Sequence, residues 1–268
     1  MKLKFWKYEG AGNDFVLLDL RNTNFEPTAE FIHAICSPRT GVGADGAMVL
    51  GCSEVADFAM RYFNADGPEA TMCGNGGRCI TWFADLLGVG GDEKVFEAVD
   101  GIHTATILER SGHTARIRLQ MVDVESVEVD GEGDVLLNTG SPHLVRRVEN
   151  LDLDVVGLGA ELRYGPKTAA TNGANINFVE VVGEGRLALR TYERGVENET
   201  LACGTGATAT AIAVCHTLQP DVRHFYLKAL GGNMEVEFTK EEGGHYRNIF
   251  LTGPARLVFA GELDTENF

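Results

Sequence analysis

Residues 72–76 read MCGNG and residues 202–206 read ACGTG, and these two short stretches are the strongest indication of the fold of this 268-residue chain. Each places a cysteine directly before a glycine-containing turn, and each turn leads into a segment that looks helical. The two cysteines lie about 130 positions apart, and other landmarks recur at nearly the same distance. A repeat of this length indicates a duplicated domain rather than a solenoid, whose periods are far shorter.

Shorter matches support the duplication because they keep one order and nearly one offset. They pair residues 43–45 with 173–175, 59–61 with 188–190, and 117–119 with 249–251. We therefore predict two pseudo-symmetric domains. One spans residues 1–120 together with the tail 262–268, and the other spans residues 121–261. An interface between two such halves is a natural place for a small-molecule site, so we expect the active site in the cleft between them.

Each half is predicted to be a mostly antiparallel sheet around one central helix, which is an α+β fold. The central helices are expected over residues 76–87 and 205–218. Most other segments are short and partly alternate apolar with polar residues, which is typical of strands. The expected strands include residues 14–19, 47–50, 58–63, 115–119, 177–182 and 234–238.

Composition limits the classes of partner. The formal net charge is −16, and a strongly acidic chain would repel nucleic acid and anionic membrane surfaces, so we expect neither as a partner. A small molecule is the expected ligand.

The N-terminal residues have no apolar signal-like region, which predicts a cytoplasmic protein with reduced cysteines. No pair of cysteines has the Cys-x-x-Cys spacing, so no metal is expected.

Cys73 and Cys203 are the candidate reactive groups. Free backbone N–H groups and the helix dipole at a helix start favour negative charge, so a cysteine there ionises more readily than a free thiol, whose pKa is about 8.5. The same N–H groups can bind a substrate carboxylate. One thiolate and one thiol on opposite faces of an α-carbon could remove a proton and return another, which inverts the stereocentre. The other cysteines, Cys36, Cys52, Cys79 and Cys215, are interpreted as small buried hydrophobes.

Five blocks of sequence resemble the signature blocks of the diaminopimelate epimerase family, in the family's order and in both halves. They are GAGNDF at 10–15, FNADG at 63–67, MCGNG at 72–76, YERG at 192–195 and ACGTG at 202–206. The resemblance implies the interconversion of LL- and meso-diaminopimelate without pyridoxal phosphate or any other cofactor. It also implies a place in lysine and peptidoglycan precursor biosynthesis.

The resemblance also implies roles for individual residues. Cys73 and Cys203 correspond to the proton donor and acceptor, and His143 and Glu193 to residues that tune the cysteines. The positions that correspond to substrate contacts are Asn13, Asn64, Gly74, Asn75, Asn175, Glu193, Arg194, Gly204 and Thr205.

Two positions depart from the family pattern. Ser141 stands where many members have asparagine, and Gly46 stands where some have glutamine. Either change is expected to loosen the distal end of the site.

Two other functions stay open on the sequence: a racemase or epimerase of the proline or hydroxyproline type, and a redox sensor in which Cys73 and Cys203 form a reversible disulfide. A homodimer is compatible with the sequence but is not indicated by it.

Overall fold

A computed structural model describes all 268 residues and divides them into two compact units. The first unit consists of Met1–Leu119 and Gly253–Phe268, and the second of Gln120–Thr252. The sequence repeat assigns residues 253–261 to the second half, whereas the structure places them in the first unit.

The long strand β17 (Tyr246–Asp264) is the reason for this difference. From Gly253 onward, this strand pairs with strands of the first unit. Gly253–Arg256 lie antiparallel to Thr114–Ile117, and the residues from Arg256 to Asp264 lie antiparallel to Lys2–Glu9. Backbone hydrogen bonds therefore tie the chain's last strand to its first, which a comparison of the two repeats alone does not reveal.

The first unit is a closed sheet around a helix. Its elements are β1 (Lys2–Gly10), β2 (Asn13–Asp19), α1 (Ala29–Cys36), β3 (Gly46–Gly51), β4 (Phe58–Asn64), β5 (Glu69–Ala70), α2 (Gly74–Leu86), β6 (Glu93–Ala98), β7 (Gly101–Ser111), β8 (Thr114–Gln120), the later part of β17 and a final 3-10 turn, η3 (Thr265–Asn267). The pairings run β1–β2–β3–β4–β6–β7–β8–β17 and return to β1. The β2–β3 and β4–β6 pairs are parallel and the others antiparallel.

The second unit repeats the connectivity of the first. Its elements are β9 (Val127–Val129), β10 (Val135–Asn138), β11 (Pro142–Arg147), α3 (Val155–Arg163), η1 (Pro166–Thr171), β12 (Asn175–Gly183), β13 (Arg186–Glu193), β14 (Asn198–Thr200), α4 (Gly204–Thr217), β15 (His224–Ala229), β16 (Gly232–Lys240), η2 (Glu242–Gly244) and the start of β17. The β11–β12 and β13–β15 pairs are parallel, in the places that β2–β3 and β4–β6 occupy in the first unit. The predicted duplication and α+β fold are confirmed.

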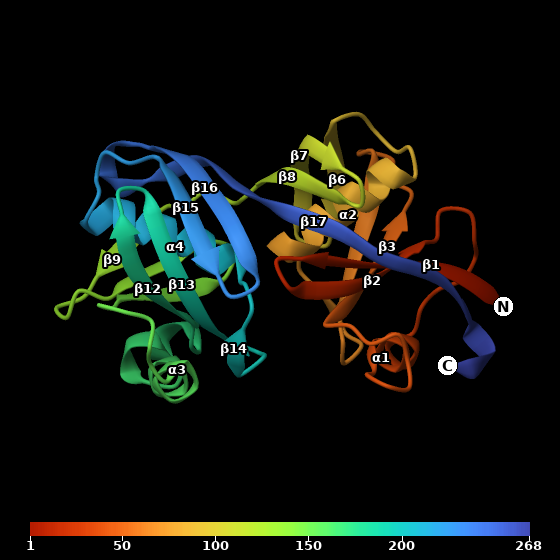
Figure 1. Ribbon diagram of the computed structural model, residues 1–268, viewed down its shortest axis with the longest axis horizontal. Helices are drawn as coiled ribbons and strands as arrows, with labels where there is room; N and C mark the ends of the chain where they lie inside the picture. The colour runs from red at the N-terminus through yellow and green to blue at the C-terminus, as the bar shows by residue number, and fades with distance from the viewer. The chain divides into compact units, whose positions relative to one another are not determined.

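The central helices α2 and α4 are the predicted ones, and strands surround each of them within its own unit (Figure 1). Helix α4 is rich in alanine and threonine and is buried on nearly all sides from Gly204 to Cys215. Small side chains let the strands approach closely. The hydroxyls of Thr208 and Thr210 donate to the carbonyls of Gly204 and Gly206, at 3.0 and 2.7 Å, so the buried hydroxyls are satisfied within the helix. None of the helices combines the length and apolarity needed to cross a membrane.

Helices α1 and α3 were not predicted. Each forms the crossover between two parallel strands, α1 between β2 and β3 and α3 between β11 and β12. Each begins at a side-chain cap: Thr28 accepts from the backbone N–H of Phe31, and Asp154 from that of Gly157. Both helices are short, so their apolar periodicity is weak in the sequence.

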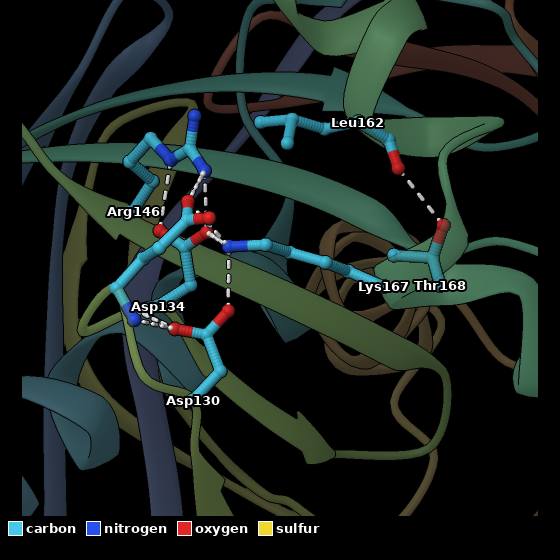
Figure 2. Close-up of polar contacts among 7 residues, drawn as sticks. Asp130, Asp134, Arg146, Leu162, Lys167 and Thr168 are labelled. Carbon is cyan, nitrogen blue, oxygen red and sulfur yellow. Dashed lines mark hydrogen bonds and ion pairs between the residues drawn. The ribbon is translucent and has the colours of Figure 1, made fainter.

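A group of ion pairs fixes the segment that leads into β12 (Figure 2). Lys167 on η1 lies 2.6 Å from Asp134 and contacts Asp130, while Arg146 on β11 also pairs with Asp134. On the other side of η1, the hydroxyl of Thr168 donates to the carbonyl of Leu162 at 2.8 Å. These contacts of Lys167 and Thr168 fix the position of η1, which precedes Asn175, the first residue of β12.

Candidate active site

Cys73 is the N-cap residue of α2, with extended backbone angles of φ −90° and ψ 131°. Its sulfur is half-buried and donates to Oδ1 of Asn13 at 3.7 Å. No side-chain hydrogen bond caps the helix at this position. The backbone N–H groups of Gly74, Asn75 and Gly76 therefore begin the helix beside the sulfur, as the sequence predicts.

Two asparagines and an aspartate organise the surroundings of Cys73. Asn13 donates through Nδ2 to Oδ2 of Asp45 at 2.7 Å, which orients the amide. Its oxygen then accepts from the Cys73 sulfur and, at 3.5 Å, from Nδ2 of Asn75. The predicted site residues Asn13, Cys73 and Asn75 are thus brought together. Asp45 was missed by the sequence reasoning, although it lies next to the glycine-rich run 41–43.

Arg78 also supports this group and was not predicted. Its side chain is fully buried in α2, and it donates to Oδ1 of Asn75 at 2.9 Å and to the carbonyls of Gly74 and Pro254. Burial lowers the pKa of the guanidinium, and the nearby Cys79 and Cys73 oppose that shift. A buried cation with fixed donors holds the first turn of α2 in place. The signal in the sequence is an arginine inside an otherwise uncharged helix start.

Asn64 and Gly46 face each other across β3 and β4. Asn64 is exposed at the last position of β4, and its backbone closes the following turn with Gly67 and Pro68. Gly46 has no room for a side chain, because an added Cβ would lie 2.6 Å from the carbonyl oxygen of Phe63 and 2.8 Å from the Tyr62 ring. In this chain the position is filled by the neighbouring Tyr62, so the departure at Gly46 does not leave open space.

Cys203 is the N-cap residue of α4 and occupies the position equivalent to Cys73. The residue is 6% exposed, and its sulfur accepts from the backbone N–H of Gly206 at 3.4 Å. The hydroxyl oxygen of Thr205 lies 3.3 Å from the same sulfur. The Cys73 sulfur thus donates to the amide oxygen of Asn13, whereas the Cys203 sulfur accepts from a backbone N–H group.

His143 lies on β11, is buried, and is held through both ring nitrogens. Nδ1 lies 3.0 Å from Nδ2 of Asn177, and Nε2 lies 3.0 Å from the hydroxyl of Ser141. Burial, and to a smaller extent the positive charge of Arg194, lower the pKa of His143 to about 3. The ring is therefore neutral at physiological pH.

Asn175 joins the histidine to Arg194. Its Nδ2 donates to Oγ of Ser141 at 3.0 Å, and its Oδ1 accepts from the backbone N–H of Arg194 at 2.8 Å. The Arg194 guanidinium donates to the carbonyl of Gly173 at 3.3 Å. Glu193 is the last residue of β13 and is half-buried. The predicted residues His143, Asn175, Arg194, Thr205 and Cys203 thus belong to one connected group of contacts.

Asn177 is the site residue that the sequence reasoning missed in this unit. It is fully buried, contacts His143, and its Oδ1 accepts from the hydroxyl of Thr191 at 3.0 Å. A Cβ on Gly206 would lie 2.4 Å from that same oxygen, so only glycine fits there. The available signal was spacing: Asn175 and Asn177 are two apart in a strand, so they share a face of the sheet.

The remaining cysteines lie outside these groups. Cys36, Cys79 and Cys215 are buried, and burial raises the pKa of each thiol, to about 12 for Cys36. Cys52 is exposed, so its interpretation as a buried hydrophobe is wrong; it follows directly after the end of β3, where the strand leaves the core. All six cysteines are free thiols.

The family described as Diaminopimelate epimerase matches residues 5–126 and 135–258. Diaminopimelate epimerase of Flavobacterium psychrophilum is 45% identical over 259 residues, which covers 96% of this chain and 98% of the relative. Diaminopimelate epimerase of Chlorobaculum tepidum is 40% identical, with 95% and 98% covered.

Two solved structures show the same fold at low identity. A Bacillus anthracis phenazine biosynthesis protein of the PhzF family has a TM-score of 0.76 at 17% identity and covers 98% of this chain and 99% of that chain. A hydroxyproline epimerase from Agrobacterium vitis has a TM-score of 0.68 at 16% identity, with 98% and 92% covered. Because the family match extends over both units and the sequence relatives align over nearly their whole length, this chain belongs to the diaminopimelate epimerase family.

Proposed function

We propose that this protein epimerises diaminopimelate, converting the LL form to the meso form: one cysteine removes the α-proton and the other returns a proton to the opposite face. The observation that carries the proposal is the equivalent placement of Cys73 and Cys203, each as the N-cap of a central helix in a duplicated unit of this family. The names of the sequence relatives support the substrate, and we propose lysine and peptidoglycan precursor synthesis in the cytoplasm as its place.

In the proposed reaction the two sulfurs act on opposite faces of one α-carbon. The thiolate of one cysteine takes the α-proton and becomes a thiol, and the electron pair left on the carbon delocalises into the adjacent carboxylate. The thiol of the other cysteine then gives its proton to the opposite face and becomes the thiolate. No proton is gained or lost overall, and the reverse reaction uses the same groups with their roles exchanged.

The helix starts supply what an amino-acid substrate needs. N–H groups at Gly74 and Asn75, and at Gly204 and Thr205, are oriented to bind a carboxylate and to stabilise charge that builds up as the proton leaves. We assign Asn13, Asn64, Asn175, Glu193 and Arg194 to the remaining carboxylate and ammonium groups of the substrate. Neutral amides with a single arginine bind such groups without burying an unpaired charge.

Exchange of the α-proton with solvent tests the proposal directly. Reduced protein is incubated in D₂O with LL-diaminopimelate, with EDTA present and without pyridoxal phosphate, and the α-proton signal and the meso product are followed by NMR. We expect deuterium at the α-position together with formation of the meso isomer. Proline and trans-4-hydroxyproline serve as parallel substrates.

Each result has a separate meaning. Exchange on proline or hydroxyproline in place of diaminopimelate would assign the protein to the other epimerase type. If no substrate exchanges, the proposed reaction is wrong, and reversible loss and return of the two thiols on oxidation and reduction would then favour a redox sensor.

A further inference from the structure

Two hydroxyl groups stand between the buried imidazole of His143 and the sulfur of Cys203. Oγ of Ser141 lies 3.0 Å from Nε2 of His143 and 3.5 Å from Oγ1 of Thr205. Oγ1 of Thr205 lies 3.3 Å from the Cys203 sulfur. Ser141 departs from the family pattern, and the proposed reaction uses only the backbone N–H group of Thr205, so neither hydroxyl takes part in that reaction.

The direction of these hydrogen bonds is set at the His143 end. Nδ2 of Asn177 donates to the carbonyl of Leu144 at 3.2 Å, which fixes the amide with its nitrogen toward the imidazole. An amide nitrogen only donates, so Nδ1 of His143 accepts from it at 3.0 Å. In the neutral ring the proton then sits on Nε2, and Nε2 donates to Ser141.

The hydroxyl of Ser141 has one direction left for its own proton. Asn175 is oriented by the backbone N–H of Arg194, which donates to its Oδ1 at 2.8 Å, so Nδ2 of Asn175 donates to Ser141 at 3.0 Å. A serine oxygen accepts two hydrogen bonds and donates one. With both acceptor positions used, the Ser141 proton points to Thr205. The Thr205 proton is then available to the sulfur of Cys203, which lies 3.3 Å away.

We propose that Ser141 and Thr205 are positioning residues that form a one-way relay of hydrogen bonds from His143 to Cys203 and hold Cys203 as a thiolate. The inference rests on the proposed function, to which it adds how one of the two cysteines is prepared for its role. A thiolate gains from each donor that points at it, because hydrogen bonds to charged groups are stronger than those between neutral groups. The N–H group of Gly206, at 3.4 Å, is a second donor to the same sulfur.

The relay supplies oriented dipoles and no net charge. Burial keeps the pKa of His143 far below neutral, so the ring donates as a neutral group throughout the physiological range. Because the 3.5 Å contact between Ser141 and Thr205 is the longest in the relay, removal of the Thr205 hydroxyl should matter more than removal of the Ser141 hydroxyl.

Alkylation of Cys203 tests the relay. The full-length reduced protein is treated with iodoacetamide over a range of pH, and modification of each cysteine is followed by mass spectrometry. The pH at which the Cys203 rate is half its maximum reports its ionisation independently of how accessible the sulfur is. In Thr205→Val we expect this pH to rise by about one unit, so the rate on the acidic side falls about tenfold. Ser141→Ala should give a smaller rise of the same sign, and Thr205→Ser should retain the unmodified profile.

Thr208→Val is the matched control, because it removes a hydroxyl from the same helix that bonds only to the carbonyl of Gly204. It should leave the Cys203 profile unchanged, and thermal unfolding checks that each variant is folded. If Thr205→Val does not fold, Ser141→Ala and Thr205→Ser decide the question. An unchanged half-maximal pH in both Thr205→Val and Ser141→Ala overturns the relay.

The relay and the proposed function fail in different measurements. Epimerisation by the unmodified protein together with an unshifted Cys203 profile in the variants refutes the relay alone. A shifted profile in a protein that exchanges no α-proton refutes the proposed reaction and leaves the thiolate assignment in place.

Discussion

Nδ2 of Asn177 lies 3.0 Å from Nδ1 of His143, and this contact decides which nitrogen of the ring carries the proton. It makes Nδ1 an acceptor and leaves Nε2 to donate toward Ser141. The same ring is buried, with a pKa lowered to about 3. His143 is therefore a neutral hydrogen-bond donor in the folded protein and not a proton carrier at neutral pH.

The stability of the protein should fall in acid partly because of His143. In the unfolded chain its pKa is close to 6.5, so below that pH the unfolded state binds a proton that the folded state rejects. The stabilisation is present above pH 6.5 and is lost as the pH falls toward about 3. Between pH 7 and pH 5 this one group should lower the free energy of unfolding by about 2 kcal/mol.

Urea unfolding of the unmodified protein and of His143→Gln at both pH values measures the effect. Other titrating groups contribute equally to the two proteins, so the difference between their pH dependences isolates the histidine. Equal pH dependence in the two proteins would show that the pKa of His143 is not lowered in the folded state.

Replacement of either N-cap cysteine should greatly slow the proposed epimerisation. Serine ionises far less readily than cysteine, so Cys73→Ser and Cys203→Ser should each lower kcat by about 10²- to 10⁴-fold, the usual contribution of a general acid or base. Cys52→Ser is the control, because Cys52 is exposed and follows β3 outside the site groups. Formation of meso product at the normal rate by either N-cap variant contradicts the two-cysteine reaction.

Gly206→Ala should destabilise the second unit. The new Cβ would lie 2.4 Å from Oδ1 of Asn177, which is itself buried and bonded to Thr191, so one of the two must move. Overpacking of this kind costs about 1–3 kcal/mol. Gly131→Ala is the matched control, since a Cβ at Gly131 meets nothing within 4 Å. Chemical denaturation should separate the two variants, and equal midpoints would show that the Asn177 contact is not tight.

Lys167, in the ion-pair group of Figure 2, also pairs with Glu132 at 2.9 Å, and Asp134 should stabilise the protein more than Glu132 does. The Asp134 side chain is 4% exposed and contacts both Arg146 and Lys167, whereas the Glu132 side chain is 71% exposed. Asp134→Asn leaves two cations with a weaker partner and should cost about 1–3 kcal/mol, while Glu132→Gln should cost less than about 0.5 kcal/mol.

The pKa of Asp134 is lowered in the folded protein: burial would raise it, but Arg146 and Lys167 outweigh that effect. Its stabilisation is therefore present at neutral pH and is lost as the pH falls through the folded-state pKa. Thermal unfolding at pH 7 compares the two variants, and a Glu132→Gln loss as large as that of Asp134→Asn would count against this ranking.

Much of this fold could be predicted because duplication gives each signal twice. The cysteine blocks at 72–76 and 202–206 predicted where both central helices begin and end to within two residues. Helices α1 and α3 were missed because each has few residues and is defined by a cap at Thr28 or Asp154 and by packing against strands distant in sequence.

A site residue could be predicted where it lies in one of the five blocks that resemble the family. A residue that only holds such a block in place could not be predicted. Asn13 and Asn75 lie in such blocks, whereas Arg78 is recognisable only once its contacts with Asn75 and Gly74 are known. Asn177 is similar, because its role comes from the parallel pairing of β12 with β11, which places it opposite Val145 and within reach of His143. Pairings of this kind are set by tertiary structure and leave no local pattern.

The strand β17 also has a consequence for synthesis on the ribosome. The first unit closes only when residues 253–264 pair with β1 and β8, and these residues are made after every other strand of that unit and after the whole second unit. Until then, an emerging N-terminal half carries two unpaired strand edges, which are templates for wrong pairing. Although the two units arose as copies, the N-terminal unit cannot complete its fold before the second unit has been made. A contiguous fragment 1–119 should therefore be prone to aggregate.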